Sequence, residues 1–378
     1  MQPFRVSIPQ ADLDDLNARL AATRWPAELP GVGWSRGVPL GYLKELAEYW
    51  RTEYDWRVAE AKLNSFPNFR TRIDGSDIHF VHVRSPHENA IPLLLTHGWP
   101  GGVVEFVDLV EPLTRPAPGE QAFHLVVPSI PGYGFSTLEE TGWDVPRIAR
   151  AWAELMSRLG YDRYIAQGGD AGSVISLELG RTAPDHVLGV HVNMLMTFPS
   201  GDPADFADLD EVDQARLGRL GQFDAELSGY MRVMAQRPQT LAYSLTDSPV
   251  GQLAWIVEKF REWSDAALVP EDAVCRNHLL TIVSTYWLTA SGGSSAQFYY
   301  EGAEGVRLAA SGVKPPPIEV PVGVAVFPRD LFLPIRRWAD RDIPTIKHWT
   351  EFDRGGHFAA MEQPDLLAGD IAKFARSL

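Results

Sequence analysis

The sequence contains one cysteine and no long hydrophobic run. Cys275 stands alone among 378 residues, which excludes an internal disulfide and a cysteine-based zinc cluster. The longest apolar strings, such as residues 91–95, have the length of a strand, whereas a membrane span needs about 20 apolar residues. The first twelve residues also lack the basic end and apolar stretch of a secretion signal. We therefore expect a cytoplasmic protein that does not enter a membrane.

Positive charge is scarce as well. The chain has 34 Lys and Arg against 49 Asp and Glu, a formal net charge of −15. This balance argues against a broad phosphate-binding surface and hence against nucleic acid as a partner. Charged residues at 22% and hydrophobic residues at 45% are typical of a globular protein. A homodimer, the commonest assembly of soluble proteins, is the prior expectation for the oligomeric state.

Aromatic residues, by contrast, are plentiful. The chain has 12 Trp and 11 Tyr. Such large rings suit either a hydrophobic core or a pocket for an organic molecule. Composition alone favours the core.

The N-terminal segment, residues 1–69, is predicted to be helical and to wrap around the remainder of the protein. Apolar residues recur at helical spacing in 10–22, and a second helix is predicted over 40–51. Two prolines and three glycines between residues 25 and 37 separate them. The segment has too few apolar residues to fold alone, so it should pack on the rest of the chain.

An alternation of strands and helices begins after this segment and predicts one α/β domain. Residues 70–73 and 78–83, joined by Asp74-Gly75, predict a β-hairpin. Continuous apolar strands separated by helices then predict a parallel sheet covered on both faces. The predicted strands are 91–96, 124–128, 164–167, 188–194, 320–327 and 345–352. The predicted helices are 103–113, 145–159, 172–181, 333–341 and 361–377. The core is thus expected at 70–197 and 310–378, with a helical lid at 198–309.

A glycine-rich turn joins a predicted strand to a predicted helix. Residues 168–172, Gly-Gly-Asp-Ala-Gly, have the form of a nucleophile elbow, whose sharp turn requires tiny neighbours. The residue at its apex is Asp170. A carboxylate is already anionic at neutral pH and needs no base before it attacks. It suits displacement at an sp3 carbon, which yields an alkyl ester. A glycine-rich loop with a helix-capping aspartate is the alternative.

Residues 97–101, His-Gly-Trp-Pro-Gly, follow the strand predicted at 91–96. In an α/β architecture with a nucleophile elbow, this loop and the residue after the nucleophile supply two oxyanion-hole donors. The candidates are the backbone N–H groups of Trp99 and Ala171, because Pro100 has none. An ordinary strand-to-helix turn is the alternative.

One of the ten histidines occupies the position expected of a catalytic base. His357 lies after the last predicted strand and before the last helix, and so comes after a nucleophile and an acid in chain order. Asp330, just after the strand at 320–327, is the preferred acid; Asp353 is closer in sequence but should be solvated. His97 is expected to form structural hydrogen bonds. No two histidines have zinc-ligand spacing, and neither a metal nor an organic cofactor is expected.

Four strings in this order resemble the epoxide hydrolases of the α/β-hydrolase superfamily, specifically the microsomal-type branch with an N-terminal wrapping segment. They are residues 96–101, 128–136 (Pro-Ser-Ile-Pro-Gly-Tyr-Gly-Phe-Ser), 168–172 and 355–360 (Gly-Gly-His-Phe-Ala-Ala). The resemblance covers about residues 3–374. It implies an enzyme with a mostly parallel central sheet, helices on both faces and a helical lid. Six lysines against 28 arginines favour a bacterial source, and the short apolar strings favour a soluble enzyme.

The resemblance also implies the roles of individual residues. Asp170 matches the nucleophile, His357 the base and Asp330 the acid that orients the base. Two lid tyrosines of the family hold and protonate the epoxide oxygen, and they match Tyr299 and Tyr230.

Without the resemblance, the sequence around Tyr230 and Tyr299 would favour a role in packing. The resemblance alone favours a role in the reaction. Tyr300 is the adjacent competitor of Tyr299, and its side chain should point elsewhere. Trp99 is expected to line the substrate pocket with the two tyrosines.

The implied reaction converts an epoxide, the small-molecule substrate, into a vicinal diol through an ester on Asp170. A haloalkane dehalogenase is the nearest rival, but that enzyme typically has Trp directly after its nucleophile where this chain has Ala171. A ligand-binding protein without chemistry is the rival from another class. Lid residues Trp255, Trp263 and Trp287 hint at a bulky or aryl epoxide. Related bacterial enzymes act in secondary metabolism, which suggests a role there.

Overall fold

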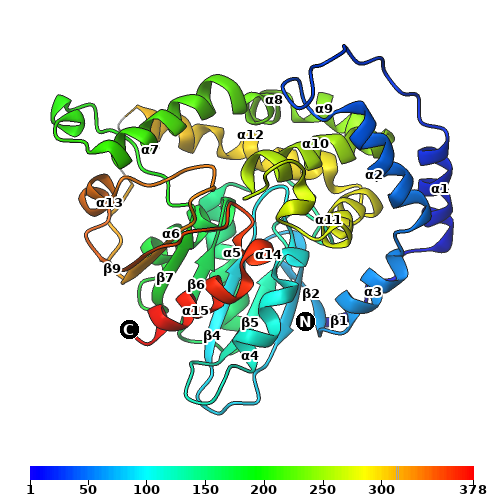
Figure 1. Ribbon diagram of the computed structural model, residues 1–378. Coiled ribbons are helices and arrows are strands. Elements are labelled where there is room, and N and C mark those ends of the chain that lie inside the picture. The colour runs from blue at the N-terminus through cyan, green and yellow to red at the C-terminus, as the bar shows by residue number, and fades with distance from the viewer. Residues whose placement is uncertain (312, 314) are drawn as a thin grey trace.

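A nine-stranded sheet forms the centre of the molecule (Figure 1). The computed structural model describes residues 1–311, 313 and 315–378. Gly312 and Lys314, in the predicted second part of the core, lie outside the described residues. The strand order is β1-β2-β3-β5-β4-β6-β7-β8-β9. The strands are β1 (Gln2–Phe4), β2 (Asn68–Ile73), β3 (Ser76–Val83), β4 (Ile91–Thr96), β5 (Phe123–Pro128), β6 (Tyr164–Gly168), β7 (Val187–Asn193), β8 (Val322–Val326) and β9 (Ile346–Glu351).

The sheet is antiparallel at one side and parallel over the rest. β1 pairs with β2, β2 with β3 and β3 with β5 in antiparallel register. From β5 to β9 all neighbouring strands are parallel. Parallel neighbours need a crossover, which this chain makes mostly with helices. The loops after β4, β6 and β8 therefore emerge at the same edge of the sheet, where catalytic residues of such folds gather.

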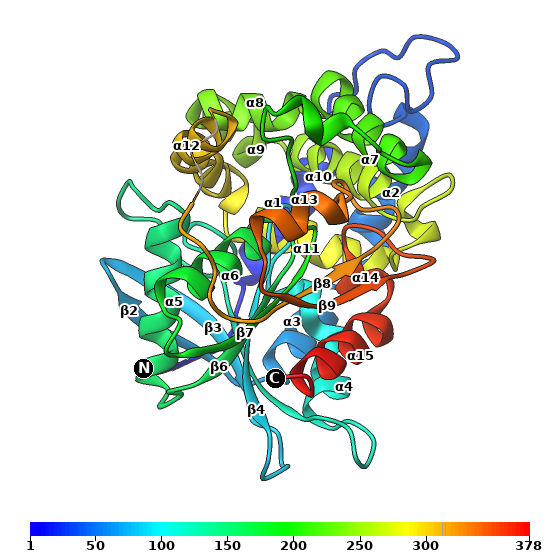
Figure 2. The ribbon, with the colours of Figure 1, turned by 90° about the vertical axis from the view of Figure 1, so that its left-hand side faces the viewer.

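Helices cover both faces of the sheet (Figure 2). On one side lie α5 (Val145–Arg158) and α6 (Ala171–Thr182), with Trp152 and Ile175 fully buried. On the other side lie α4 (Val110–Thr114), α14 (Ala359–Glu362) and α15 (Pro364–Ala375). The fold is the α/β-hydrolase fold, as the sequence predicts.

A helical insertion lies over the carboxyl ends of the strands, between β7 and β8 (Figure 1). Its helices pack on one another and on the core through buried apolar residues such as Leu253, Phe260 and Leu279. They are α7 (Glu211–Gln222), α8 (Gly229–Gln236), α9 (Pro238–Asp247), α10 (Pro249–Trp263), α11 (Arg276–Leu288) and α12 (Ser291–Ala310).

The N-terminal segment runs along the insertion and the core. It contains α1 (Gln10–Ala21), α2 (Leu40–Thr52) and α3 (Trp56–Asn64), followed by β2. Trp50 is 2% exposed, and its indole N–H donates to Ser284 Oγ of α11 at 2.9 Å. Arg19 forms an ion pair with Asp247 at 2.9 Å. The segment thus contacts helices that lie more than 200 residues further along the chain.

Three local predictions need correction. The short β1 was missed, because three residues give too little pattern to detect. The helix predicted over 103–113 is a 3-10 helix (Val103–Leu109) followed by α4. The helix predicted over 361–377 is two helices, because Pro364 has no N–H for the helical ladder and begins α15 instead.

A buried charge cluster joins β7, β9 and α15. Asp370, 1% exposed, accepts hydrogen bonds from His191 Nε2 at 3.0 Å, His348 Nε2 at 2.8 Å and Thr350 Oγ1 at 2.6 Å. Burial alone raises the pKa of the Asp370 carboxyl, but these hydrogen bonds and the His191 charge bring the pKa far below its ordinary value. The carboxylate therefore stabilises the fold at every pH above its unfolded pKa of about 3.9, and this contribution is lost as the pH falls.

We expect Asp370→Asn to lower the free energy of unfolding by about 3–5 kcal/mol at pH 7, because it removes one partner from a buried charged cluster. The difference from wild type should shrink below about pH 4, where the wild-type carboxylate loses its advantage. Urea unfolding at both pH values measures this. Asp340→Asn is the control, since Asp340 pairs with Arg336 at the surface, and it should change the free energy of unfolding by less than about 1 kcal/mol. A loss of less than about 1 kcal/mol at pH 7 in Asp370→Asn would contradict the prediction.

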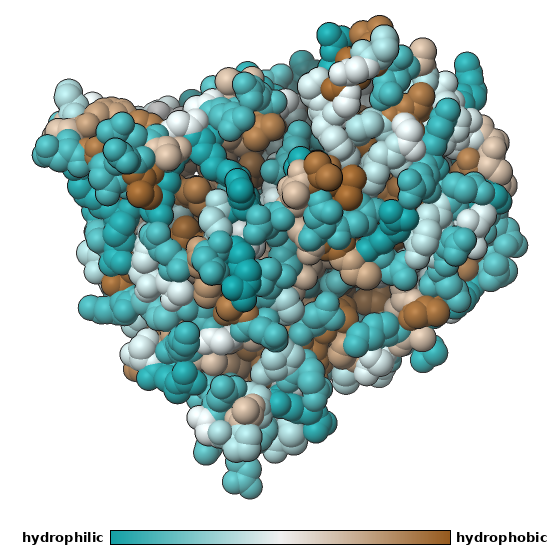
Figure 3. Space-filling model, viewed as in Figure 1, coloured by the Kyte–Doolittle hydropathy of each residue, from teal (hydrophilic) through white to brown (hydrophobic). Residues whose placement is uncertain are grey.

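Hydrophilic residues predominate on the face shown in Figure 3, with hydrophobic residues scattered among them. Within the part of the chain that the structure describes, no helix combines the length and the apolar character needed to cross a membrane.

Candidate active site

Asp170 lies at a sharp turn between β6 and α6. Its backbone is in an unusual conformation for a residue with a side chain, with φ 51° and ψ −128°. The neighbouring glycines are required by close contacts: a Cβ on Gly172 would overlap Thr96 O, and one on Gly168 would overlap the Gly172 backbone. The strained turn holds the carboxylate above the end of the sheet.

His357 lies between two aspartates. Its Nδ1 is 2.8 Å from Asp330 Oδ1 and its Nε2 is 3.4 Å from Asp170 Oδ2. An isolated bridge between Arg329 and Gly356 holds the loops of the acid and the histidine side by side. Asp353, the alternative acid, points into solvent with 83% of its side chain exposed. The structure therefore places Asp330, not Asp353, beside the imidazole.

The other carboxylate oxygen of Asp170 faces backbone donors. The Trp99 N–H donates to Asp170 Oδ1 at 2.9 Å, and the Ala171 N–H also bonds to this carboxylate. Gly98 makes the approach possible, since a Cβ there would overlap Asp170 Oδ1. The two oxygens thus differ: Oδ1 accepts the Trp99 N–H and Oδ2 faces His357.

Two tyrosines of the helical insertion meet over Trp99. Tyr230 begins α8 after a π-helical turn, Phe223–Leu227, and stacks on Trp99 with ring centroids 5.1 Å apart and planes 12° apart. Tyr299 of α12 lies 5.9 Å from Tyr230 and 6.0 Å from Trp99, edge-on to both. Tyr300 is 53% exposed. The structure brings Tyr230 and Tyr299 together and leaves Tyr300 at the surface.

The charges of the site hold Asp170 ionised and His357 protonated. Burial raises the pKa of Asp170, but contacts with His357 and the two backbone donors outweigh it and lower the pKa below its ordinary value. Burial lowers the pKa of His357, but Asp330 and Asp170 raise it to about 10. Burial and the Asp170 charge raise the pKa of both Tyr230 and Tyr299. Both phenols therefore carry their protons at neutral pH.

Comparisons with known proteins decide the family. A family model described as "Epoxide hydrolase N terminus" matches residues 1–106, and one described as "alpha/beta hydrolase fold" matches residues 91–240. A putative epoxide hydrolase of Stigmatella aurantiaca is 49% identical over 381 residues, covering 100% of this chain and 85% of the relative. Epoxide hydrolase 1 of Sus scrofa is 36% identical, with coverages of 99% and 88%. The chain belongs to the epoxide hydrolases.

A solved structure agrees with this family. The epoxide hydrolase of Aspergillus niger superposes with a TM-score of 0.88 at 34% identity, covering 100% of this chain and 96% of the other. This epoxide hydrolase thus shares its N-terminal segment, its sheet and its helical insertion with a relative over nearly the whole length of both.

Two residues near the catalytic groups of this epoxide hydrolase were not found in the sequence as site residues. Glu105 is buried, and burial, with the Asp170 charge, raises its pKa to about 8 against the opposing charge of His357. Trp263 packs edge-on against His357 at 5.1 Å, and its carbonyl accepts the His357 backbone N–H at 2.8 Å. Glu105 has no motif to reveal it. In the sequence, Trp263 is only one of several tryptophans of the lid.

His97 has the structural role that the sequence predicts. Its Nε2 accepts the backbone N–H of Ile130 at 3.1 Å, and its Nδ1 lies 3.0 Å from Gly98 O. These contacts hold the loop that carries Trp99. Both ring nitrogens of His97 thus bind backbone groups, and the residue belongs to the scaffold of the site.

The fold brings together two histidines that lie far apart in the sequence. His191, His348 and Asp370 place possible ligand atoms within 4.8 Å of one another. Sequence spacing could not show this, because the three residues come from β7, β9 and α15. Their atoms already satisfy one another as hydrogen-bonding partners, and His191 Nδ1 is buried without a partner among the described residues. A bound metal would require a proton on that Nδ1, and such protons normally have a partner.

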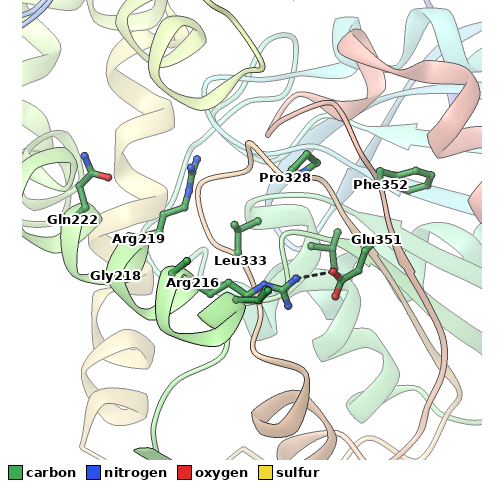
Figure 4. Close-up of a pocket in the computed structure, with 11 residues that line it drawn as sticks. Arg216, Gly218, Arg219, Gln222, Pro328, Leu333, Glu351 and Phe352 are labelled. Carbon is green, nitrogen blue, oxygen red and sulfur yellow. Dashed lines mark hydrogen bonds and ion pairs between the residues drawn. The ribbon is translucent and has the colours of Figure 1, made fainter. Parts of the chain in front are cut away.

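A separate cavity of about 540 Å³ lies behind the loop that carries Asp330 (Figure 4). Arg219 donates to Arg329 O at 2.8 Å, and Arg216 donates to Pro334 O at 2.7 Å. Because both arginines belong to α7, the cavity wall ties the helical insertion to the acid's loop. Asp170, His357 and Asp330 do not line it. Its walls are Val212, Ala215, Arg216, Gly218, Arg219, Gln222, Val326, Pro328, Leu333, Glu351 and Phe352.

Proposed function

We propose that this epoxide hydrolase opens its substrate through a covalent ester on Asp170. The arrangement of the two Asp170 oxygens carries the proposal. Oδ1 accepts the Trp99 N–H at 2.9 Å, whereas Oδ2 faces His357 at 3.4 Å, beneath Tyr230 and Tyr299. This difference supports the assignment of Oδ1 as the future ester carbonyl and of Oδ2 as the attacking oxygen.

In the first step, Asp170 Oδ2 attacks one carbon of the epoxide. The new C–O bond forms as the ring C–O bond breaks, and the ring oxygen leaves as an alkoxide. Tyr230 and Tyr299 donate hydrogen bonds to that oxygen, and one of them transfers its proton. General acid assistance of this kind typically contributes about 10²–10⁴-fold to the rate. The product is a hydroxyalkyl ester.

In the second step, His357 removes a proton from water, and the resulting hydroxide attacks the ester carbonyl. The developing negative charge on Oδ1 is stabilised by the N–H groups of Trp99 and Ala171. The ester bond then breaks, and the alkoxide that leaves takes the proton of the new carboxylic acid, so that the diol, the Asp170 carboxylate and protonated His357 result. Asp330 orients the imidazole and balances the charge that it gains.

The charge of Asp170 couples the two steps. In the free enzyme the Asp330 and Asp170 charges raise the pKa of His357 to about 10 despite its burial. Ester formation neutralises Asp170 and removes one of these two charges, so the pKa of His357 falls. The imidazole then gives its proton to solvent, and it can act as a base only once there is an ester to hydrolyse.

A single turnover in water labelled with heavy oxygen tests the covalent route. With enzyme in excess, the new oxygen of the first diol should come from Asp170, so the diol should contain no label. The label should appear in Asp170 instead, and in the diol from the second turnover onward. Label in the first-turnover diol would exclude the ester.

The two tyrosines should act on ring opening and not on ester hydrolysis. We expect Tyr299→Phe and Tyr230→Phe each to slow ester formation by about 10–100-fold and the double variant by about 10²–10⁴-fold. Tyr300→Phe is the matched control, because Tyr300 is 53% exposed and its variant should keep the wild-type rate. Rapid mixing with a single turnover separates the two rate constants. An equal slowing of both steps would contradict an acid role.

We also propose a bulky or aryl epoxide as the substrate. Trp99 and Trp263 are buried 6.0 Å apart beside the tyrosines, so the surroundings of the nucleophile are rich in aromatic side chains. A place in secondary metabolism rests on the resemblance alone. A panel of aryl and alkyl epoxides, with the chirality of each diol measured, tests the substrate class; faster turnover of small alkyl epoxides would contradict it.

The helical insertion, residues 198–309, is proposed to be the lid of this site, and residues 1–69 its wrapping segment. The rival dehalogenase activity predicts halide release from haloalkanes. We expect none, because Ala171 replaces the halide-binding Trp and the tyrosine pair takes its place above the nucleophile. Assaying halide and diol side by side separates the two activities.

A further inference from the structure

Lys259 carries a buried charge in the helical insertion. It lies on α10, and its side chain is 4% exposed. Its ammonium forms ion pairs with Glu258 at 2.5 Å and with Glu262 at 3.0 Å. The two carboxylates are less buried, with 26% and 27% of their side chains exposed. The cation therefore lies on the inner side of this charged group and the anions on the outer side.

The inner neighbours of Lys259 are aromatic residues of the active site. Its Nζ lies 5.0 Å from the centre of the Tyr230 ring and 5.8 Å from that of Trp263. Both distances are within the range of a cation–π contact. Tyr230 in turn stacks on Trp99, whose N–H binds Asp170. The ammonium is thus one side chain away from the catalytic centre.

The other charges near Tyr230 oppose the loss of its proton. After burial, the negative charges of Asp170 and Glu262 raise the pKa of its phenol. A phenol that must give its proton to an alkoxide works against these charges. A fixed cation over the ring offsets them, because the phenolate form is attracted to it and the phenol form much less.

We propose that Lys259 is a positioning residue for the reaction: its ammonium holds the ring of Tyr230 and stabilises the phenolate that forms when Tyr230 protonates the epoxide oxygen. The inference rests on the proposed acid role of Tyr230. The proton passes from the phenol oxygen to the ring oxygen as the ring C–O bond breaks. Solvent returns a proton to the phenolate before the next turnover.

Packing alone does not account for a lysine here. Burying an ammonium is unfavourable unless its partners compensate, and an apolar side chain of similar length would fill the same space without that penalty. The chain instead has a lysine here. Its ammonium pairs with Glu258 and Glu262 on the outer side and lies against the ring of Tyr230, the proposed proton donor.

The test compares Lys259→Met, which keeps the length but removes the charge, with Lys259→Arg, which keeps a cation. We expect Lys259→Met to slow ester formation by about 10- to 30-fold and to leave ester hydrolysis within about twofold of wild type. Lys259→Arg should recover most of the rate. Lys62→Met is the matched control, since Lys62 lies 5.3 Å over the Phe66 ring far along the chain from the site and should leave both steps unchanged.

A double-mutant cycle with Tyr230→Phe isolates the coupling. If Lys259 acts through the phenol, Lys259→Met should slow ester formation no further in the Tyr230→Phe background. An undiminished effect in that background, or no effect of Lys259→Met in the wild-type background, overturns the proposal. A wild-type rate for Tyr230→Phe itself would instead overturn the acid role of the tyrosine, so the two failures are distinguishable.

Glu262→Gln tests the same idea with the lysine retained, and thus remains informative if Lys259→Met does not fold. Removing this carboxylate leaves the Lys259 ammonium with one anionic partner, Glu258, in place of two. It also removes a negative charge that disfavours the Tyr230 phenolate. Ester formation should therefore become faster, by up to about tenfold. A slower or unchanged rate in folded Glu262→Gln overturns the proposal.

Discussion

The Asp170→Ala variant should form no diol from any epoxide that the wild-type enzyme opens. The side chain supplies the attacking oxygen, and neither His357 nor the tyrosine pair can replace it. Without the nucleophile we expect kcat to fall by roughly 10⁴-fold or more, the scale seen when a nucleophile is removed from a preorganised site. Diol formation followed by chiral chromatography over many hours measures the residual activity.

Two controls separate lost chemistry from lost folding. Asp353→Ala removes an aspartate from the loop beside His357, but its side chain is 83% exposed, so activity should stay within about twofold of wild type. Asp170→Asn keeps a residue type that tolerates the positive φ of 51° at this turn. Both position-170 variants should be inactive while unfolding cooperatively. Retention of more than about 1% of wild-type kcat in Asp170→Ala would favour direct attack by water.

The His357→Gln variant should stop the reaction halfway. The Trp99 and Ala171 N–H groups still bind the Asp170 carboxylate and the tyrosines remain in place, so the epoxide should still open and form the ester. Glutamine cannot accept a proton from water at neutral pH, and ester hydrolysis should slow by about 10²–10⁴-fold. The enzyme should therefore accumulate as a covalent adduct.

Mass spectrometry of the intact protein detects that adduct. We expect His357→Gln to gain the mass of one epoxide molecule per chain, with the modification on the peptide that contains Asp170. His186→Gln, at an exposed histidine whose Nδ1 lies 2.9 Å from Asp162 O, should show no lasting adduct and full turnover. Loss of turnover in His357→Gln without any adduct would contradict this prediction, because it would show that the imidazole is needed already for ring opening.

Sequence patterns were sufficient for the fold because they are local. The apolar strands after residue 90 and the glycines around Asp170 each act within a few residues. Such signals predicted the bounds of β4 without error and those of the other parallel strands to within one or two residues. The short β1 escaped, since its pairing with β2 depends on a partner more than sixty residues away.

The site was predictable only where a residue belongs to a motif. Asp170 and His357 lie in turns with a characteristic sequence, and the structure brings them together with Asp330. Glu105 and Lys259 lie inside ordinary helical patterns, so nothing in the sequence distinguishes them from surface charges. Their burial comes from the way that distant elements pack around the active site, which no local spacing encodes.

The contact between Trp50 and Ser284 has a consequence for how the protein is made. The two residues are 234 positions apart, and a ribosome adds about 5–20 residues each second. The first helices thus emerge roughly 10–50 s before their partners exist. During that interval Leu16, Leu46 and Trp50, all 5% exposed or less in the finished molecule, have no surface to cover. Newly made chains should therefore depend on chaperones that shield the amino-terminal end, and mutations in α11 should reduce yield in the cell more than they reduce the stability of the purified enzyme.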